Sequence, residues 1–458
     1  MLLVLFGFHF LDSVDRWLLP AVLPHIDQDL GLSNSETAWL TTILLISFAV
    51  ASPPIGYFAD RLNRRRLLAV GVAVWGLATM WTGLARSYSQ LQAARSIAGI
   101  GGAAIGVVGL TLLMDAFPRQ IRSRVLAVYF LAMPLGAAVG LISGSILARE
   151  TGWQIAFLLT GSVGVFSALA AFLLPEPVRG ASEGIEEPKL RIHERAGASQ
   201  EDYIDLMVNS SYTYSVFGLT FSAFAIGGLS YWLPSFLSVV KRLPREQSTL
   251  GLGLVTLSAA IVGIGLGAIL ADRLGRRSLK ALFLIPALAV FLAIPCHVVA
   301  LSSQRPGLIL GAIFLTECLL WFPLAPCYAI IAGVTMPNMR AAGVAAAFCA
   351  GHFLGDIWSP SIMGWAIETF GQPDTMATPL GRLLAAIGVA PVRQSGRDPE
   401  NLMAGMLVVI PAMLIASTVL VAGARHLPRE MALMLAKLRA APSRFARLRP
   451  RSAPLPRR

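Results

Sequence analysis

Ionisable side chains inside otherwise apolar segments are the residues of this chain best placed to do chemistry. The first apolar run contains His9, Asp12, Asp15 and Arg16, and positions 9, 12 and 16 share one face of a helix. A charge at mid-bilayer costs about 2.5–3.5 kcal/mol on insertion scales, so it needs a partner or a task. Burial raises the pKa of a carboxyl group and a nearby arginine lowers it, so a pair whose separation changes can load and release a proton. Asp15 and Arg16 are the candidate pair, and a permanent salt bridge is the alternative.

Four further charged groups lie in later apolar runs: Arg95, Glu317, His352 and Asp356. The guanidinium of Arg95 can bind a phosphate or carboxylate of a substrate, or it can neutralise an aspartate of the first run. His352 and Asp356 are one helical turn apart, as in a metal site or a proton relay. Two ligands do not make a metal site, so an interhelical hydrogen-bonded pair is favoured and no metal is expected. Glu317 either faces an aqueous cavity or pairs with His352.

The elements that must position these groups are membrane-spanning helices. The chain of 458 residues is 55% hydrophobic with a mean hydropathy of +0.68, above the roughly 45–50% apolar content of soluble domains. Apolar runs of about 20 residues recur, and each is long enough to cross a hydrocarbon core of about 30 Å. The expected helices lie near 2–24, 37–59, 67–85, 88–113, 123–147, 153–174, 211–239, 250–271, 279–301, 307–334, 340–370 and 402–424.

A repeated loop divides these helices into two halves. The sequence Ala59-Asp60-Arg61-Leu62-Asn63-Arg64-Arg65 follows the second run, and Ala271-Asp272-Arg273-Leu274-Gly275-Arg276-Arg277 follows the eighth, 212 positions later. The most polar stretch of the chain lies between the halves. We therefore expect a six-helix bundle over 1–174, a cytoplasmic linker over 175–210, a second six-helix bundle over 211–424 and a basic cytoplasmic tail over 425–458.

The distribution of basic residues predicts the orientation. With both termini in the cytoplasm, and with Arg124, Lys280 and Arg340 at the cytoplasmic helix ends counted as inside, inside segments carry 26 Lys and Arg residues, outside loops carry 9 and helices carry 2, as the positive-inside rule requires. Arginine outnumbers lysine by 33 to 4, which suggests a bacterial source and hence an inner membrane. The four cysteines fall in apolar runs without CxxC spacing, so free thiols are expected.

Two segments outside the helices carry further expectations. The tail 425–458 holds ten basic residues against one acid, Glu430. We expect the tail to lie along anionic lipid head groups or to be solvated and disordered, and nucleic acid is not an expected partner. In the first case four apolar side chains would share one helical face: Met431, Met434, Leu435 and Leu438. The long outside loop 371–401 is either a short interfacial helix or a lid.

The repeated loop resembles a known family signature. Its first copy, from Gly56 to Arg65, closely resembles the GxLADRxGRR loop between helices 2 and 3 of the major facilitator superfamily. An aspartate at this helix end can pair with arginines and with the positive end of a neighbouring helix, and so hold one face of the bundle shut. A plain positive-inside loop is the alternative. The resemblance assigns a gating role to Asp60, Arg61, Arg64, Arg65, Asp272, Arg273, Arg276 and Arg277.

Other segments are similar to the spinster-like transporters of that superfamily. They are Val14-Asp15-Arg16, Arg122-Ser123-Arg124-Val125-Leu126, and His352-Phe353-Leu354-Gly355-Asp356-Ile357-Trp358-Ser359-Pro360, which looks like that family's HLLGDxxSP run. The resemblance implies an amphiphilic substrate with a charged head, such as a lysophospholipid or a sphingoid lipid. The chain departs from the family at Gly102, where relatives usually have glutamate, and at Asp12, where they tend to have asparagine. Our hypothesis is that a proton-binding carboxylate has moved from position 102 to position 12.

Together these features predict an all-α membrane protein of about twelve transmembrane helices in two six-helix bundles, the major facilitator fold. We expect a monomeric secondary transporter without cofactors that moves an amphiphile by proton-coupled alternating access. No GxxxxGK sequence occurs and no strand precedes the glycine clusters, which disfavours an ATP-driven pump. The alternatives are an organic-anion/proton symporter of the same superfamily, a non-transporting membrane sensor, and a membrane enzyme, which would lack an activated serine, cysteine or metal constellation.

Overall fold

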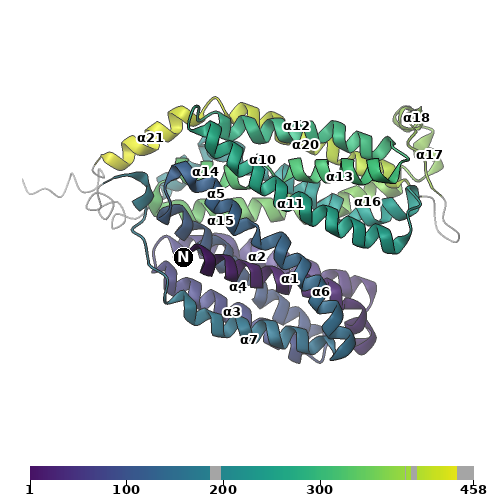
Figure 1. The fold of residues 1–458 in the computed structure, drawn as a ribbon, viewed down its shortest axis with the longest axis horizontal. Helices are drawn as coiled ribbons and strands as arrows, with labels where there is room; N and C mark the ends of the chain where they lie inside the picture. The colour runs from purple at the N-terminus through teal and green to yellow at the C-terminus, as the bar shows by residue number, and fades with distance from the viewer. Residues whose placement is uncertain (186–197, 387, 393–399, 441–458) are drawn as a thin grey trace, which may run out of the picture.

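Helices make up the fold, as the apolar runs predict (Figure 1). The computed structural model describes residues 1–185, 198–386, 388–392 and 400–440, and the pairing of extended segments in these ranges is limited to an isolated bridge between Val392 and Glu400. Eleven segments of the described residues are long and apolar enough to cross a membrane. A further helix, α1 (Leu2–Leu30), has 29 residues but carries the charged groups of the first apolar run. The expected all-α fold with about twelve spanning helices is confirmed.

The N-terminal half forms the lower bundle in Figure 1. Besides α1 it comprises α2 (Asn34–Ala59), α3 (Arg64–Leu84), α4 (Tyr88–Ala116), η1 (Arg119–Ile121), α5 (Arg122–Phe130), α6 (Ala132–Glu150) and α7 (Trp153–Ala171). Side-chain caps define where several of these helices begin. Ser33 and Glu36 form a capping box at α2, while Asn63 and Ser87 cap α3 and α4. The loop of the signature sequence thus ends directly in a capped helix.

The C-terminal half forms the upper bundle in Figure 1. It comprises α10 (Ser210–Ser235), η3 (Phe236–Val240), α11 (Arg245–Gly275), α12 (Ala281–Ser302), α13 (Pro306–Leu320), α14 (Leu324–Val334), η4 (Pro337–Met339), α15 (Arg340–Ala350), η5 (Gly351–Asp356), α16 (Ser359–Thr369), α19 (Leu402–Leu407) and α20 (Val409–Gly423). The segments η3 and η5 are π-helical, a geometry that is frequent at functional sites.

Glycines on α6 bring the charged helix α1 into close contact with its neighbour. A Cβ atom at Gly140 would lie 2.4 Å from the carbonyl oxygen of Val14, and one at Gly136 would lie 2.6 Å from that of Phe10. Because glycine has no side chain, the backbones of α1 and α6 can approach one another closely at these two positions. This packing fixes the position of α1 inside the N-terminal bundle.

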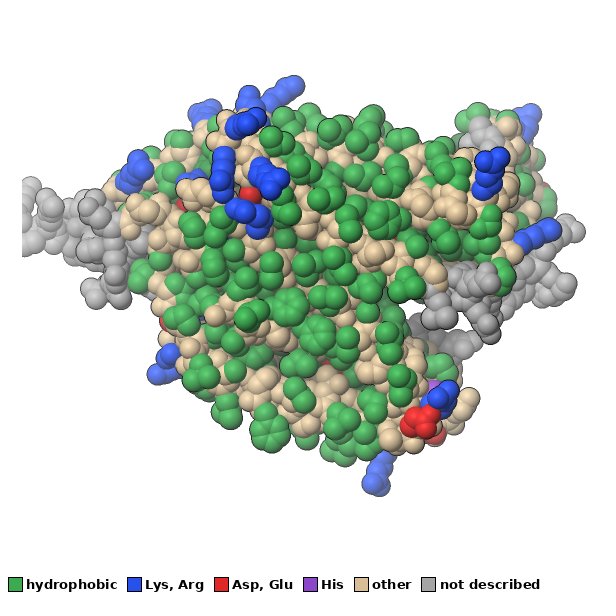
Figure 2. Space-filling model, viewed as in Figure 1, with side chains coloured by type: hydrophobic (Ala, Val, Ile, Leu, Met, Phe, Trp, Pro, Cys, Tyr) green, Lys and Arg blue, Asp and Glu red, His purple; other side chains and the backbone are tan. Residues whose placement is uncertain are grey.

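The two halves meet along a seam that crosses the middle of the molecule. Helix α2 of the N-terminal half packs on α15 of the C-terminal half, and α5 packs on α11 and α14. Figure 2 shows hydrophobic side chains over the middle of the molecule, while Lys and Arg gather mainly toward the end that carries α21 (Leu427–Arg439). Such an apolar belt with basic side chains at one end suits a protein embedded in a bilayer.

The polar segments of the linker and the tail lie at the same end of the molecule. The linker contains η2 (Ala181–Glu183) and α9 (Gln200–Val208), and its residues 186–197 lie outside the described ranges. Helix α21 has the predicted apolar face, but protein covers that face. Met431 fits against Gly333 of α14, and Met434 and Leu438 pack with linker residues and with Met336, which precedes η4. The expectation that this face rests on lipid head groups is therefore wrong for the described part of the tail, because Gly333 leaves room for the helix to dock on the bundle.

The loop 371–401 folds at the end of the molecule opposite α21 (Figure 1). It forms two short helices, α17 (Pro373–Met376) and α18 (Pro379–Ala386), and residues 387 and 393–399 lie outside the described ranges. Leu380 and Leu383 of α18 are 55% and 61% exposed. Exposed leucines on a short helix are compatible with the interfacial helix that the sequence predicts.

Candidate functional site

The most deeply buried ion pair of the N-terminal half joins α1 to α4. Arg95 Nη1 donates to Asp15 Oδ1 at 2.9 Å and to Oδ2 at 3.1 Å, and Trp75 Nε1 donates to Oδ2 at 3.2 Å. The side chains of Asp15 and Arg95 are 0% and 1% exposed. Arg95 was expected either to bind a substrate anion or to neutralise an aspartate, and in the structure it is the counter-ion of Asp15. The expected pair of Asp15 with Arg16 does not form, because consecutive helical residues point in different directions.

A second ion pair lies one turn away on the same helix. Arg16 Nε donates to Asp12 Oδ2 at 3.0 Å, and the arginine side chain is 19% exposed. The guanidinium carbon of Arg16 lies 4.5 Å from the centre of the Phe48 ring of α2. A Cβ atom at Gly102 of α4 would lie 2.7 Å from Asp12 Oδ1. The carboxylate of Asp12 thus reaches the place where a side chain at position 102 would begin.

The C-terminal half contributes a third polar pair, on the π-helical segment η5. His352 Nδ1 lies 2.9 Å from Asp356 Oδ2, within one helix, so the pair is not the interhelical one expected from the sequence. The centre of the His352 ring lies 5.0 Å from that of Phe48. One phenyl ring therefore contacts both the Arg16 guanidinium of the N-terminal half and the imidazole of the C-terminal half. Asp356 Oδ1 is buried and has no hydrogen-bond partner in the described part of the chain.

Two other candidate residues lie apart from this cluster. Glu317 of α13 is 3% exposed and is hydrogen-bonded to Thr256 of α11, so the pairing with His352, one of its two expected roles, is absent among the described residues. His9 stacks on the Tyr129 ring of α5 with 4.5 Å between ring centres, and neither of its ring nitrogens has a hydrogen-bond partner among the described residues. The structure brings together three polar pairs and leaves Glu317 outside them.

The two aspartates of the repeated loop bind across the seam between the halves. Asp60 accepts hydrogen bonds from the backbone amides of Ala341 at 2.9 Å and Ala342 at 2.8 Å, in the first turn of α15. Asp272 accepts from the amides of Ser123 at 3.2 Å and Arg124 at 3.0 Å, in the first turn of α5. Each carboxylate therefore meets the positive end of a helix in the other half, as the signature predicts.

Burial also changes the acidity of one of these groups. It raises the pKa of Asp60 to about 6, although the amides of Ala342 and Ala341 and the charges of Arg179 and Arg64 act in the opposite direction. The closed seam thus holds a carboxyl group that titrates close to neutral pH.

The arginines of the repeated loop differ between the two copies. Arg64 binds Asp115 at the end of α4 and Glu176 of the linker, and Arg65 donates to the carbonyl oxygen of Phe172 at 3.3 Å. Arg61 lies over the Tyr57 ring and donates to the Tyr203 hydroxyl of α9 at 3.1 Å. In the second copy, Arg273, Arg276 and Arg277 are exposed and form no ion pair with another described residue. Only the first copy is tied into the linker by its arginines in the part of the chain that the structure describes.

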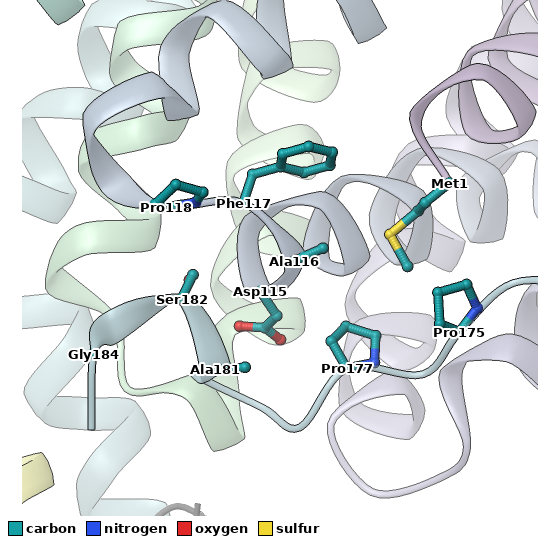
Figure 3. Close-up of a pocket in the computed structure, with 10 residues that line it drawn as sticks. All are labelled: Met1, Asp115, Ala116, Phe117, Pro118, Pro175, Pro177, Ala181, Ser182 and Gly184. Atoms are coloured by element: carbon teal, nitrogen blue, oxygen red, sulfur yellow. The ribbon is translucent and has the colours of Figure 1, made fainter. Parts of the chain in front are cut away.

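A cluster of charges beside these loops was missed by the sequence analysis. Asp115 binds both Arg64 and Arg340, and Glu183 of the linker binds both Arg122 and Arg340. A cavity of about 500 Å³ adjoins the cluster, and Figure 3 shows linker residues such as Pro177 and Ser182 on one side of it and Phe117 on the other. Arg122 and Arg340 occur at corresponding places in the two halves, and that correspondence could have indicated the cluster.

Comparison with known proteins places this geometry in a family. The model of the Major Facilitator Superfamily matches residues 5–360. Protein spinster homolog 1 of Homo sapiens is 30% identical over 380 residues, which cover 79% of this chain and 71% of the human protein. The chain is a spinster-like member of the Major Facilitator Superfamily. Protein spinster of Drosophila melanogaster is 29% identical over 365 residues, and this match covers 77% of the chain but only 59% of the fly protein.

Solved structures share the fold of this spinster-like protein. A bacterial homologue of the human lysosomal transporter Spinster, in an inward-facing and unoccupied conformation, matches with a TM-score of 0.58 and 19% identity, covering 99% of this chain and 98% of the other. The proton:xylose symporter XylE matches with a TM-score of 0.68 and 16% identity, covering 93% and 94%. The major facilitator fold expected from the repeated loop is thus confirmed.

Proposed function

We propose that this spinster-like protein is a proton-coupled secondary transporter that moves an amphiphilic molecule by alternating access. The observation that carries the proposal is the arrangement of polar pairs at the seam. Asp12 with Arg16 and His352 with Asp356 lie on opposite halves, and Arg16 and His352 both contact the Phe48 ring. A movement of one half relative to the other would change the surroundings of both pairs, which is what coupling requires.

The burial of the two aspartates of α1 favours different roles for them. The pair of Asp15 and Arg95 is enclosed and hydrogen-bonded to Trp75, which suits a permanent anchor of α1. The pair of Asp12 and Arg16 is less enclosed on the arginine side, so its partner can leave more readily. We therefore assign proton binding to Asp12. Because a proton contributes about 2.3 kcal/mol per 100 mV and about 1.4 kcal/mol per pH unit, one group suffices to drive accumulation.

The substrate class follows from the family and from the polarity of the seam. The resemblance to the spinster-like family implies a lysolipid or sphingoid-like lipid, and one structural relative is described as a homologue of a lysosomal transporter, without a named substrate. The Arg16 guanidinium over the Phe48 ring offers a cation beside an apolar surface. Such a pair suits an anionic head group attached to a hydrocarbon chain. The same cation favours the second candidate function, an organic-anion/proton symporter.

The test uses purified protein in liposomes and a fluorescent lysophospholipid. An imposed pH gradient should drive uptake by the wild type, and Asp12→Asn should remove the gradient dependence while lysolipid binding persists. Asp15→Asn should instead lower thermal stability, because breaking a buried pair costs about 3–5 kcal/mol. Wild-type uptake that ignores the gradient would refute proton coupling and leave a uniporter or a sodium-coupled carrier.

Further outcomes of the same test separate the rival functions. Lysolipid binding without movement would indicate a sensor, and a covalent change of the lipid detected by mass spectrometry would indicate an enzyme. Uptake of small organic anions in place of lysolipid would indicate the symporter.

A further inference from the structure

One carboxylate of the linker lies between the two halves of the molecule. Glu183, the last residue of η2, is 8% exposed. Its Oε1 atom accepts hydrogen bonds from Arg122 Nη2 at 2.9 Å and from Arg340 Nη2 at 2.8 Å, and Arg119 Nε lies 3.5 Å from Oε2. Arg122 belongs to the N-terminal half and Arg340 to the C-terminal half. A single linker side chain therefore joins the two bundles.

The two arginines occupy equivalent places in the two halves. Arg122 begins α5, and the next two residues donate their amides to Asp272 of the other half. Arg340 begins α15, and the next two residues donate their amides to Asp60 of the other half. Glu183 thus binds at the point where the two aspartate contacts of the seam begin. One carboxylate oxygen of Glu183 therefore bonds to the first residue of both helices.

The residues just before Glu183 are fixed to the N-terminal half. Ser182 Oγ donates to the Met114 carbonyl oxygen at 2.8 Å, and the Gly180 amide donates to Asp115 Oδ1 at 3.0 Å. Arg179 donates to the carbonyl oxygens of Ala59 at 3.0 Å and Leu62 at 2.9 Å. Figure 3 shows Asp115 beside the part of the linker that carries Ala181 and Ser182. Because this part of the linker is held by one half, its bond to Arg340 resists separation of the other half.

The charges around Glu183 favour its ionised form. Burial raises the pKa of the Glu183 carboxyl, but the charges of Arg340, Arg122 and Arg119 outweigh that effect, so the pKa lies below its usual value. Without this negative charge, Arg122 and Arg340 would repel one another inside a buried site, with Asp115 left to neutralise Arg340. The carboxylate therefore does more than fill space between the arginines.

We propose that residues 179–183 of the linker are part of the gate at this end, and that Glu183 must release Arg340 before the two halves can separate there. The proposal rests on the alternating-access part of the proposed function, but not on its substrate or coupling ion. It assigns a positioning role to a segment that otherwise only connects the bundles. The signature loops and the linker then close the same gate together.

The experiment measures the gate directly with spin labels in a cysteine-free background of the full chain. Leu62 and Leu274 are 52% and 41% exposed in the two repeated loops, so labels on L62C and L274C report the separation of the halves. Glu183→Gln keeps the shape and removes the charge. Because hydrogen bonds to charged groups contribute about 1.5–3 kcal/mol, the ratio of long to short distances should rise on the order of ten-fold.

Glu176→Gln is the matched control. Glu176 is also a linker carboxylate bound to an arginine, but its partners are Arg64 and the amides of Arg64 and Arg65, all in α3 of one half. Its replacement should leave the distance distribution unchanged. A folded Glu183→Gln protein with the wild-type distribution, or equal shifts in both variants, would overturn the proposal.

A second variant keeps the test decisive if Glu183→Gln does not fold. Glu183→Asp retains the charge on a side chain one methylene shorter, which cannot reach both arginines at hydrogen-bond distance. It should shift the distribution in the same direction by a smaller amount, and an unchanged distribution would again overturn the proposal. The distances are recorded without substrate and without a pH gradient, so a failure of lipid uptake would refute the proposed function and leave this result standing.

Discussion

Asp12 and Gly102 face each other across the contact between α1 and α4. A Cβ atom at Gly102 would lie 2.7 Å from Asp12 Oδ1 and 3.5 Å from Arg16 Nη2. The aspartate therefore uses the room that the missing side chain leaves, and a glutamate at position 102 would bring its carboxylate to the same arginine. This relationship supports the hypothesis that a carboxylate has moved between the helices.

The first prediction moves the carboxylate from position 12 to position 102. Asp12→Asn should lose gradient-driven uptake, and adding Gly102→Glu in that background should restore part of it, because the new carboxylate can pair with Arg16. Gly102→Glu alone should lower uptake, since two carboxylates would then compete for one site. Uptake driven by a pH gradient in liposomes measures all three variants.

Gly102→Ala in the Asp12→Asn background is the control, because it adds the Cβ atom without a carboxylate. If the alanine and glutamate variants recover uptake equally, or if neither recovers it while both fold, the carboxylate has not moved in this way.

The polar pairs show which parts of the site sequence reasoning can reach. Helical periodicity placed Asp12 and Arg16 on one face, and they pair. The partner of Asp15 lies 80 positions away in α4, where local spacing carries no information, so the sequence left two roles open for Arg95. The gate aspartates were predictable because their loop is repeated and resembles a known signature, whereas Glu183 sits in a linker without periodicity.

The second prediction concerns the gate aspartate Asp60. An asparagine there presents an NH2 group to one of the two amides that now donate to the carboxylate, so one hydrogen bond of the seam is lost. Asp60→Asn should therefore loosen closure at neutral pH. The reporter is a cysteine at Ala345, which is 0% exposed and faces Gly56 of α2. Its alkylation rate in a cysteine-free background should rise on the order of ten-fold.

Asp272→Asn makes the equivalent change in the second copy of the loop and should act in the same direction. Wild-type alkylation and transport in both variants would mean that the loops only set the topology.

The third prediction is a pH dependence of the same gate. The pKa of Asp60 is raised from 3.8 to about 6 by burial in the closed seam, and it should return to its usual value when opening hydrates the carboxyl. At pH values between these two pKa values, Asp60 binds a proton when the gate closes. The closed population should therefore grow as the pH falls from about 7 to about 5. A protonated carboxyl keeps one acceptor oxygen and can turn its hydrogen away from the amides, which asparagine cannot do.

The spin-label pair at positions 62 and 274 measures this effect. The charged groups that act on Asp60 are Arg179 and Arg64. The wild type should show more short distances at about pH 5.5 than at about pH 7.5, and Asp60→Asn should lack that part of the change. An identical pH response in both proteins would assign the titration to another group.

The fourth prediction tests the topology. Glu201 of α9 and Asp374 of α17 are exposed. Helix α9 contacts α21 through Asp205 and Lys437, and Figure 1 shows α21 and α17 at opposite ends of the molecule. Single cysteines at positions 201 and 374 should react with a membrane-impermeant maleimide from opposite faces of the membrane, the linker position from the cytoplasm. Reaction of both from one face would contradict the arrangement of two six-helix halves.

In helix α21, the spacing of apolar residues did not predict which surface the helix packs on. The spacing of Met431, Met434 and Leu438 predicted the helix and its apolar face, but it could not tell lipid from protein as the surface below. That choice depends on Gly333, which lies about 100 positions earlier.

The last prediction concerns the contact between this tail helix and the C-terminal bundle. Glu430 of α21 accepts hydrogen bonds from the amides of Ser210 at 3.1 Å and Ser211 at 2.8 Å, and so caps the first turn of α10. Glu430→Gln replaces one acceptor by a donor and removes the charge that favours a helix N-terminus, which should destabilise the protein by about 1 kcal/mol. Lys437→Gln is the control, because Lys437 pairs with Asp205 only at the exposed surface, where such pairs contribute little. Thermal unfolding in detergent should show a lower midpoint for Glu430→Gln and a wild-type midpoint for Lys437→Gln; equal midpoints in all three proteins would mean that α21 does not secure α10.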